Sequence, residues 1–262
     1  MIDTHCHLTF PEFAGQPGGV VKALSLAASH DVSGCITIST TTHNALECLA
    51  VTRGHERVWC SAGVHPGYSD DGPHDWTLMR RVGEDPKCVA WGELGLDKHW
   101  PDPAIDLQRR VLDDQLAAIE SWTGEGLAKP VIIHCREAFD DLLPRLAASS
   151  LPRDRYVFHC FTGTPDEARR VLDFGAWISF TGVVTYRNAP GVHAVAKLVP
   201  ADRVMVETDA PFLSPEPHRK ERPCQPWMTS VTAKAIASLR GVPWPAFHDQ
   251  LNDNTFRFFG IR

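Results

Sequence analysis

Two histidines separated by one residue stand near the first residue of the chain, in the stretch IDTHCHL. Side chains alternate between the two faces of a β-strand, so Asp3, His5 and His7 share one face if this stretch is a strand. Imidazole nitrogens and carboxylate oxygens are ligands for divalent first-row metal ions. Because a short His-x-His pair also occurs by accident on solvated edge strands, a metal site here requires further ligands elsewhere in the chain.

Further histidines and carboxylates occur at the ends of later strand-like runs. They are Glu93 in WGELGLD, His134 in VIIHCRE, His159 in VFHCFTG and Asp209 in VMVETDAPFL. With His5 and His7 they make four imidazoles and two carboxylates, more ligands than one tetrahedral ion needs. Two ions that share Glu93 as a bridge account for this number. We therefore predict a centre for two divalent ions, with Zn, Mn and Mg left open as their identity.

Short β-branched runs alternate along the chain with helix-like segments, which is typical of parallel strands joined by crossover helices. The predicted strands cover residues 2–8, 34–39, 58–64, 89–94, 130–135, 155–161, 176–183 and 203–208. Eight β/α units without a repeat or a Ser/Gly-rich linker predict an α/β fold, a (β/α)8 TIM barrel that forms a single domain over residues 1–262. Active sites of such barrels lie at the C-terminal ends of the strands, so the six predicted ligands would meet at one mouth.

Three helices carry terminus signals. Residues 103–122 follow Asp102, a candidate N-cap, and have a proline at the first helical position. Another helix begins at Thr164, which can form a capping box with Glu167. A third, in the C-terminal part of the chain, ends at Gly241, because glycine readily takes the left-handed conformation that stops a helix.

The composition is that of an ordinary globular protein, with 43% hydrophobic and 22% charged residues and no apolar run long enough to span a bilayer. We expect a cytoplasmic monomer without membrane contact, since no export signal is present. The eight cysteines lack paired C-x-x-C spacing, which favours reduced thiols over disulfides. A net charge of −6 gives no general attraction to nucleic acid, so a polyanion must be held by a local basic rim or by metal ions.

The chain resembles the TatD family of metal-dependent hydrolases, amidohydrolase-like barrels whose members are described as deoxyribonucleases. The resemblance covers nearly the whole length. Its motifs are IDTHCHL at 2–8, GVHP at 63–66, GELGLD at 92–97, VIIHCREA at 131–138, FHCFTG at 158–163, ETDAPFL at 207–213 and NTFRFFG at 254–260. Related barrels often bridge their ions with a carboxylated lysine, whereas the fourth predicted strand ends in Glu93, which favours the TatD branch over phosphotriesterase-like enzymes.

The resemblance implies how the six ligands divide between two ions. One ion is held by His5, His7, Glu93 and Asp209, and the other by Glu93, His134 and His159. The family also commonly carries Arg-Asn-Glu-Pro after the last strand, where this chain reads HRKERPCQPW with Cys224-Gln225-Pro226 in place of Asn-Glu-Pro. If that loop positions the substrate, the substrate preference of this chain differs from that of the usual member.

The same loop carries three basic residues that suit a phosphate chain, although a merely solvated loop is the alternative. They are Arg219, Lys220 and Arg222.

Four further residues are candidates for supporting roles. Arg136, just past His134, offers a planar donor fork to phosphate oxygens, and His65 at the end of the third predicted strand is a second phosphate contact. The alternatives are a salt bridge for Arg136 and a turn histidine for His65. Asp3 and Glu207 could orient a metal-binding histidine or serve only as polar core residues.

The predicted function is hydrolysis by a metal-activated water, with Asp209 as the base that takes the proton of that water. We predict a phosphodiesterase whose substrate is DNA and which prefers single strands or ends, because ligands at the bottom of a barrel mouth are out of reach of a duplex. The family resemblance implies action from the 3′ end. The alternatives are a hydrolase of another ester or amide with the same centre, and a metal-binding protein without catalysis.

Overall fold

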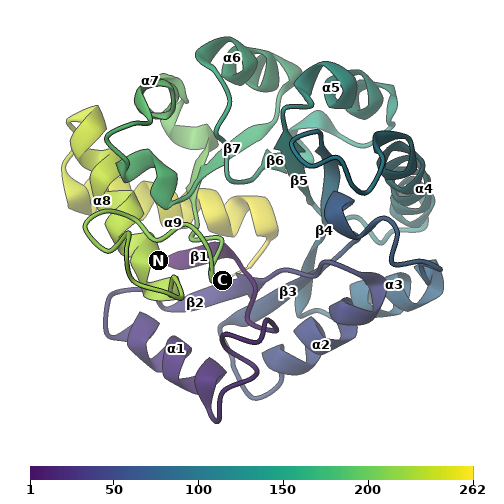
Figure 1. Cartoon of the computed structure of the whole chain (residues 1–262), viewed down its shortest axis with the longest axis horizontal. Helices are drawn as coiled ribbons and strands as arrows, with labels where there is room; N and C mark the ends of the chain where they lie inside the picture. Colours follow the sequence, from purple (N-terminus) through teal and green to yellow (C-terminus); the bar gives the residue numbers. More distant parts are fainter. Residues whose placement is uncertain (262) are drawn as a thin grey trace.

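The computed structural model describes residues 1–261, which form one parallel eight-stranded sheet surrounded by helices (Figure 1). The strands stand in the sheet in chain order and every neighbouring pair from β1 to β8 is parallel. Their bounds are β1 Ile2–Cys6, β2 Gly34–Thr37, β3 Val58–Ala62, β4 Cys88–Asp97, β5 Val131–Arg136, β6 Tyr156–Phe158, β7 Trp177–Phe180 and β8 Val204–Val206. The predicted (β/α)8 TIM barrel is therefore confirmed.

Helices α1 to α8 surround the strands in Figure 1, and α9 lies behind them. They are α1 Gly19–Ala28, α2 Thr42–Thr52, α3 Trp76–Gly83, α4 Ile105–Gly124, α5 Phe139–Ala148, α6 Pro165–Phe174, α7 Pro190–Leu198, α8 Thr229–Arg240 and α9 Trp244–Phe259. Short 3-10 turns lie in the loops, at η1 Pro66–Tyr68, η2 Arg153–Arg155, η3 Gly182–Thr185, η4 Ala201–Arg203 and η5 Pro226–Met228. No helix within residues 1–261 is both long and apolar enough to cross a membrane.

The barrel closes through the segment that follows β8. Cys6 forms an isolated parallel bridge with Ala210, and the His7 N–H donates to the Ala210 carbonyl at 2.7 Å. The Asp209 N–H donates to the His5 carbonyl at 2.9 Å, and Asp209 itself has a left-handed φ of 59°. Closure of the barrel therefore brings Asp209 beside His5 on β1 and His7 just after it.

The apolar core leaves only one end of the barrel for polar chemistry. Residues near the starts of several strands, among them Ile2, Ile132 and Met205, pack in one buried cluster with Phe258 and Phe259 at the end of α9. Figure 1 shows α9 passing behind the ring of strands. Since burial of apolar surface is the main favourable contribution to folding, this packing closes the N-terminal end of the barrel.

Two predicted helix termini are confirmed. The Thr164 hydroxyl accepts from the Glu167 N–H at 3.2 Å, and the Glu167 carboxylate accepts from the Thr164 N–H at 2.7 Å, which completes the capping box of α6. Helix α8 stops at Gly241, whose φ is 65°.

The predicted start of α4 was wrong. The helix begins at Ile105, and its N-cap residue, Ala104, makes no side-chain cap. The side chain of Gln108 donates to the carbonyls of Asp97 and Pro103, at 2.9 and 2.7 Å, so the loop before α4 is tied to the end of β4 instead of continuing the helix.

The strand ends and the last helix also differ from prediction. Strands β6, β7 and β8 are shorter than predicted. Cys160, two residues after the end of β6, has a positive φ of 42°, and β7 is followed by the 3-10 turn η3 at Gly182–Thr185. Strand β4 is longer and reaches Asp97. Helix α9 was not predicted. It follows Pro243 and carries Pro245 in its first turn, where proline is well tolerated.

Candidate metal centre

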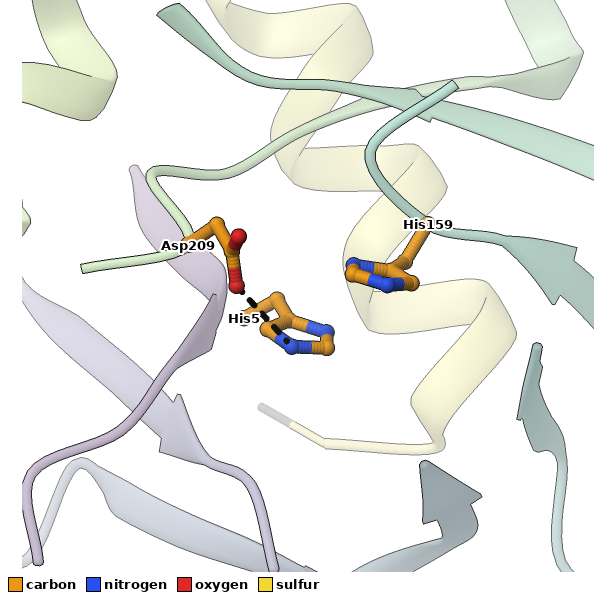
Figure 2. Close-up of side chains that lie close together, drawn as sticks. All are labelled: His5, His159 and Asp209. Carbon is orange, nitrogen blue, oxygen red and sulfur yellow. Dashed lines mark ion pairs between the residues drawn. The ribbon is translucent and has the colours of Figure 1, made fainter. Parts of the chain in front are cut away.

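The six predicted ligands meet at the C-terminal end of the barrel. Glu93 comes from β4 and His134 from β5, while His159 directly follows β6 and Asp209 lies three residues after the end of β8. Figure 2 shows Asp209 and His159 pointing toward His5 from two different loops. The rings of His5 and His159 stack at a centroid distance of 4.0 Å.

Glu93 lies in the middle of the cluster and is only 1% exposed. Its Oε1 atom is 2.7 Å from His134 Nδ1 and 2.6 Å from His159 Nε2. Its Oε2 atom is 3.2 Å from His5 Nε2. The two oxygens of one carboxylate thus face two different groups of histidines, which is the arrangement that a bridging ligand requires.

Asp209 joins His5 and His7, at the end of β1. Its Oδ1 atom is 3.5 Å from His5 Nε2, marked in Figure 2, and 3.4 Å from His7 Nε2. Both contacts use Oδ1, so Oδ2 is left available to accept a proton. The side chain is 17% exposed and lines the cavity described below.

Three histidines of the cluster have an acceptor on the ring nitrogen that faces away from it. His7 Nδ1 donates to the Ile38 carbonyl at 3.2 Å, and His134 Nε2 donates to Asp97 at 3.0 Å. His159 Nδ1 lies 3.2 Å from Glu207. A ring that donates one N–H in this way presents the lone pair of its other nitrogen to an ion, as metal-binding histidines generally do.

Glu207 is itself held in place. Its Oε1 atom accepts the Cys160 N–H at 2.6 Å, and its Oε2 atom accepts the Ser179 hydroxyl at 2.6 Å. Glu207 therefore takes the orienting position that the sequence suggested. Asp3 instead binds Thr208, whose N–H and hydroxyl donate to the Asp3 carboxylate at 2.9 and 2.5 Å, so Asp3 supports the closing segment and not a ring.

The surroundings of the His5 ring fit a metal ion. The ring is fully buried, yet neither ring nitrogen makes a hydrogen bond of good geometry within residues 1–261; Nε2 has the Glu93 and Asp209 carboxylates beside it at 3.2 and 3.5 Å. An unsatisfied buried polar atom costs about 1–3 kcal/mol, so buried groups of this kind normally have a partner. An ion at Nε2, between Glu93 and Asp209, would satisfy this nitrogen.

In His65, unlike the other histidines of the cluster, the nitrogen that faces the cluster is a hydrogen-bond donor. Its Nε2 atom lies 3.2 Å from His134 Nδ1 and 3.5 Å from Glu93 Oε1, close enough to join a ligand group with them. Its Nδ1 atom, however, accepts the Gly67 N–H at 2.9 Å, and burial lowers the pKa of His65 to about 3. The neutral ring must then carry its proton on Nε2, which makes His65 a donor toward the centre and not a metal ligand.

The cluster keeps Glu93 ionised. Burial by itself would raise the pKa of Glu93, but the charge of His159 and the hydrogen bond from His134 outweigh it and hold that pKa well below its ordinary value. In turn, burial opposes protonation of His159, and Glu93 and Glu207 outweigh this effect, so the pKa of His159 is raised. A carboxylate that stays anionic is the form that binds divalent ions.

The backbones of β4 and β5 approach each other closely, and this brings the side chains of Glu93 and His134 together. Gly95 pairs with His134 in the sheet and has a φ of +152°, and a Cβ at Gly95 would collide with the His134 carbonyl. Only glycine combines this conformation with so close an approach. Glu93 and His134 thus depend on a residue that has no side chain.

A cavity of about 690 Å³ opens over the centre, within the roughly 300–1,000 Å³ typical of small-molecule sites. Among its lining residues are His65, His134, His159, Asp209, Asp97, Arg136, Trp100 and Phe212. Arg136, predicted as a phosphate contact, is exposed there.

The three residues of the predicted basic rim are not among the lining residues of this cavity. Arg219 packs over the Tyr186 ring at 4.0 Å, and Arg222 donates to the Ser214 hydroxyl at 3.0 Å. Lys220 is exposed, and none of the three basic residues lines the cavity. In the same loop, Cys224 is fully buried in an apolar cluster, whereas Gln225, which stands where the family commonly has glutamate, is half-buried. All eight cysteines are free thiols.

Asp97 is a site residue that the sequence reading missed. It was overlooked because the predicted fourth strand stopped at residue 94, although Asp97 shares the alternating face of Glu93. We expect Asp97→Asn to weaken metal binding about 10- to 100-fold, because the amide no longer orients His134 as a carboxylate does. Titration of the metal-free protein with Mn²⁺ or Zn²⁺ checks this, and unchanged affinity would remove Asp97 from the centre.

Comparisons with known proteins place this geometry in one family. A family model described as TatD related DNase matches residues 2–260. The uncharacterized metal-dependent hydrolase YcfH of Escherichia coli (strain K12) is 36% identical over 263 residues, which cover 100% of this chain and 96% of YcfH. The 3′-5′ ssDNA/RNA exonuclease TatD of Enterobacter lignolyticus (strain SCF1) is 33% identical, with coverage of 100% of this chain and 99% of the relative.

A solved structure is similar over the same length. The crystal structure of YjjV, a TatD homolog from Escherichia coli K12, superposes with a TM-score of 0.91 at 29% identity, covering 100% of this chain and 98% of that one. The family match over the whole chain agrees with the barrel and with its group of histidines and carboxylates. The protein therefore belongs to the TatD-related DNase family of metal-dependent hydrolases.

Proposed function

We propose that this chain is a two-metal phosphodiesterase that removes nucleotides from the 3′ end of single-stranded DNA. The observation that carries the proposal is the position of Glu93, whose two oxygens face two separate groups of histidines. One ion would be held by His5, His7, Glu93 and Asp209, and the other by Glu93, His134 and His159. Imidazole ligands suit Zn and Mn, and phosphoryl transfer often uses Mg. Such a pair of ions activates water and stabilises the attacking and leaving oxygens of a phosphodiester.

The chain itself supplies the proton acceptor and two contacts to the substrate. Asp209 keeps Oδ2 free of contacts at the edge of the cavity, where it can accept the proton of the attacking water. His65 presents its Nε2–H toward the centre and can donate to a phosphate oxygen, while Arg136 offers a two-pronged donor from the cavity wall. Asp209, His65 and Arg136 line the same cavity as His134 and His159.

The depth of the centre favours a single strand with a free end. Glu93, His5 and His159 are buried at the bottom of the barrel mouth, and the loops after the strands wall it. A flexible single strand can enter such a cavity, whereas a duplex would have to unwind. The net charge of −6 also argues against a long basic track for duplex DNA. The 3′ polarity is that of the relatives named 3′-5′ ssDNA/RNA exonuclease.

A pair of substrates of one sequence tests this function. With Mn²⁺ or Mg²⁺ added, we expect a linear single strand labelled at its 5′ end to give a ladder of shortening products, and a circular strand to be spared. Duplex DNA of the same sequence should react more slowly. Rapid nicking of the circle would instead identify an endonuclease.

A hydrolase of another ester or amide is the second candidate. It would use the same centre and differ only in the cavity wall, and the apolar lining residues Val183, Phe212 and Leu213 suit a small apolar substrate as well as a nucleotide. A panel of esters and amides run beside the DNA substrates separates the two functions. Turnover of a panel member with no release of nucleotides would replace the phosphodiesterase with this alternative.

A further inference from the structure

Two exposed aromatic rings stand at the rim of the cavity that contains the metal centre. Trp100 is 60% exposed and Phe212 is 48% exposed, and both line this cavity. They are the only aromatic residues among the exposed large hydrophobics of residues 1–261. Single exposed apolar residues are common, but two aromatic rings at the mouth of one site suggest a ligand that covers them.

The two rings lie on opposite sides of the mouth. Trp100 follows β4, and its ring lies 5.8 Å from the guanidinium of Arg136 at the end of β5. Phe212 follows β8, and its ring meets that of Phe10, just after β1, at a centroid distance of 6.0 Å. Because the strands stand in the barrel in chain order, β4 and β5 lie across the barrel from β8 and β1.

Between the rings lie the groups that would act on the substrate. His134, His159 and Asp209 line the same cavity, so a phosphodiester held at the centre has one ring on either side. The two nucleosides joined by that phosphodiester extend in opposite directions from it. Each would bring its base toward one of the rings.

We propose that Trp100 and Phe212 form a pair of base-stacking positions, one for each nucleoside that flanks the scissile phosphate. The inference rests on the proposed phosphodiesterase function and identifies what holds the strand in place. Stacking on an aromatic ring does not discriminate between bases, because every base has a π-face. The two rings therefore favour normal strands strongly over abasic strands, but favour no base sequence strongly over another. Arg136 beside Trp100 adds a positive charge near the backbone of the same strand.

The test compares a normal strand with one that lacks bases. The substrate is a single strand of thymidines labelled at its 5′ end, and its matched partner has abasic sites at the two 3′-terminal positions. The variants are Trp100→Leu and Phe212→Leu, which keep apolar bulk but remove the ring, and Trp100→Phe, which keeps an aromatic face. Leu26→Ala is the control, because Leu26 is also exposed but lies on α1 outside the mouth.

We expect each Leu variant to raise KM for the normal strand about 5- to 150-fold, the range reported for loss of one base stack, with kcat changed less than about twofold. On the abasic strand, the Leu variants and the unmodified protein should differ by less than about twofold. Trp100→Phe should recover most of the affinity, and Leu26→Ala should behave as the unmodified protein. A merely structural role for the rings would affect both strands equally, and that result would overturn the proposal.

Binding measured separately from turnover distinguishes this proposal from the proposed function. Fluorescence anisotropy with the labelled strands is measured in the Asp209→Asn background, with Mn²⁺ present, to slow hydrolysis. If the normal strand binds more tightly than the abasic strand, and the Leu variants lose this difference, the stacking pair is supported. If the unmodified protein at the same time shows no turnover, the phosphodiesterase function is contradicted. If the unmodified protein turns over the strand but the Leu variants bind it normally, the stacking pair is contradicted and the phosphodiesterase function is not. Equal binding, or no binding, of normal and abasic strands overturns the stacking pair.

Discussion

Glu93→Gln is expected to leave the barrel folded while abolishing hydrolysis and most of the metal binding. Glu93 places one oxygen against His134 and His159 and the other against His5, so it reaches both groups of ligands. Glutamine keeps the size of the side chain but has one oxygen and no charge, and so cannot bridge two cations. Metal content after dialysis against Mn²⁺, turnover, circular dichroism and thermal melting check the result.

The matched control is Glu56→Gln, which changes an exposed glutamate away from the mouth of the barrel. This control should bind metal, turn over and melt as the unmodified protein does. Full metal content with near-normal turnover in Glu93→Gln would refute the bridging role.

Asp209→Asn is expected to reduce kcat at least about a hundredfold, the usual contribution of a general base. Asp209 contacts His5 and His7 through Oδ1 and keeps Oδ2 free, whereas the amide of asparagine cannot accept the proton of the attacking water. Partial loss of the ion held with His5 and His7 would add to the effect, so kcat is measured at saturating Mn²⁺. Asp249→Asn on α9, whose side chain is 80% exposed, is the control. If Asp209→Asn keeps both ions and remains active, Asp209 is not the base.

The position of the six ligands was predictable because it depends on two simple rules. Alternation along a strand puts His5 and His7 on one face, and parallel strands in a barrel bring their C-terminal ends to one mouth. Neither rule needs exact strand bounds. The six side chains therefore meet at one mouth although His159 and Asp209 lie outside β6 and β8.

Other features depend on local geometry that the residue pattern does not contain. The role of Asp97 follows from the extension of β4 beyond residue 94, and the donor role of His65 follows from a hydrogen bond with the Gly67 backbone. The start of α4 is determined by Gln108, whose side chain ties down the preceding loop. Trp100 carries no sequence signal, since only its place on the cavity wall separates it from any other surface aromatic residue.

The most direct measurement of the central claim is anomalous diffraction from crystals grown with Mn²⁺. Two peaks about 3.5–4 Å apart are predicted, the spacing of two-metal sites, with Glu93 between them. One peak should lie beside His5, His7 and Asp209, and the other beside His134 and His159. A single peak, or two peaks of which Glu93 contacts only one, would contradict the bridged two-metal centre.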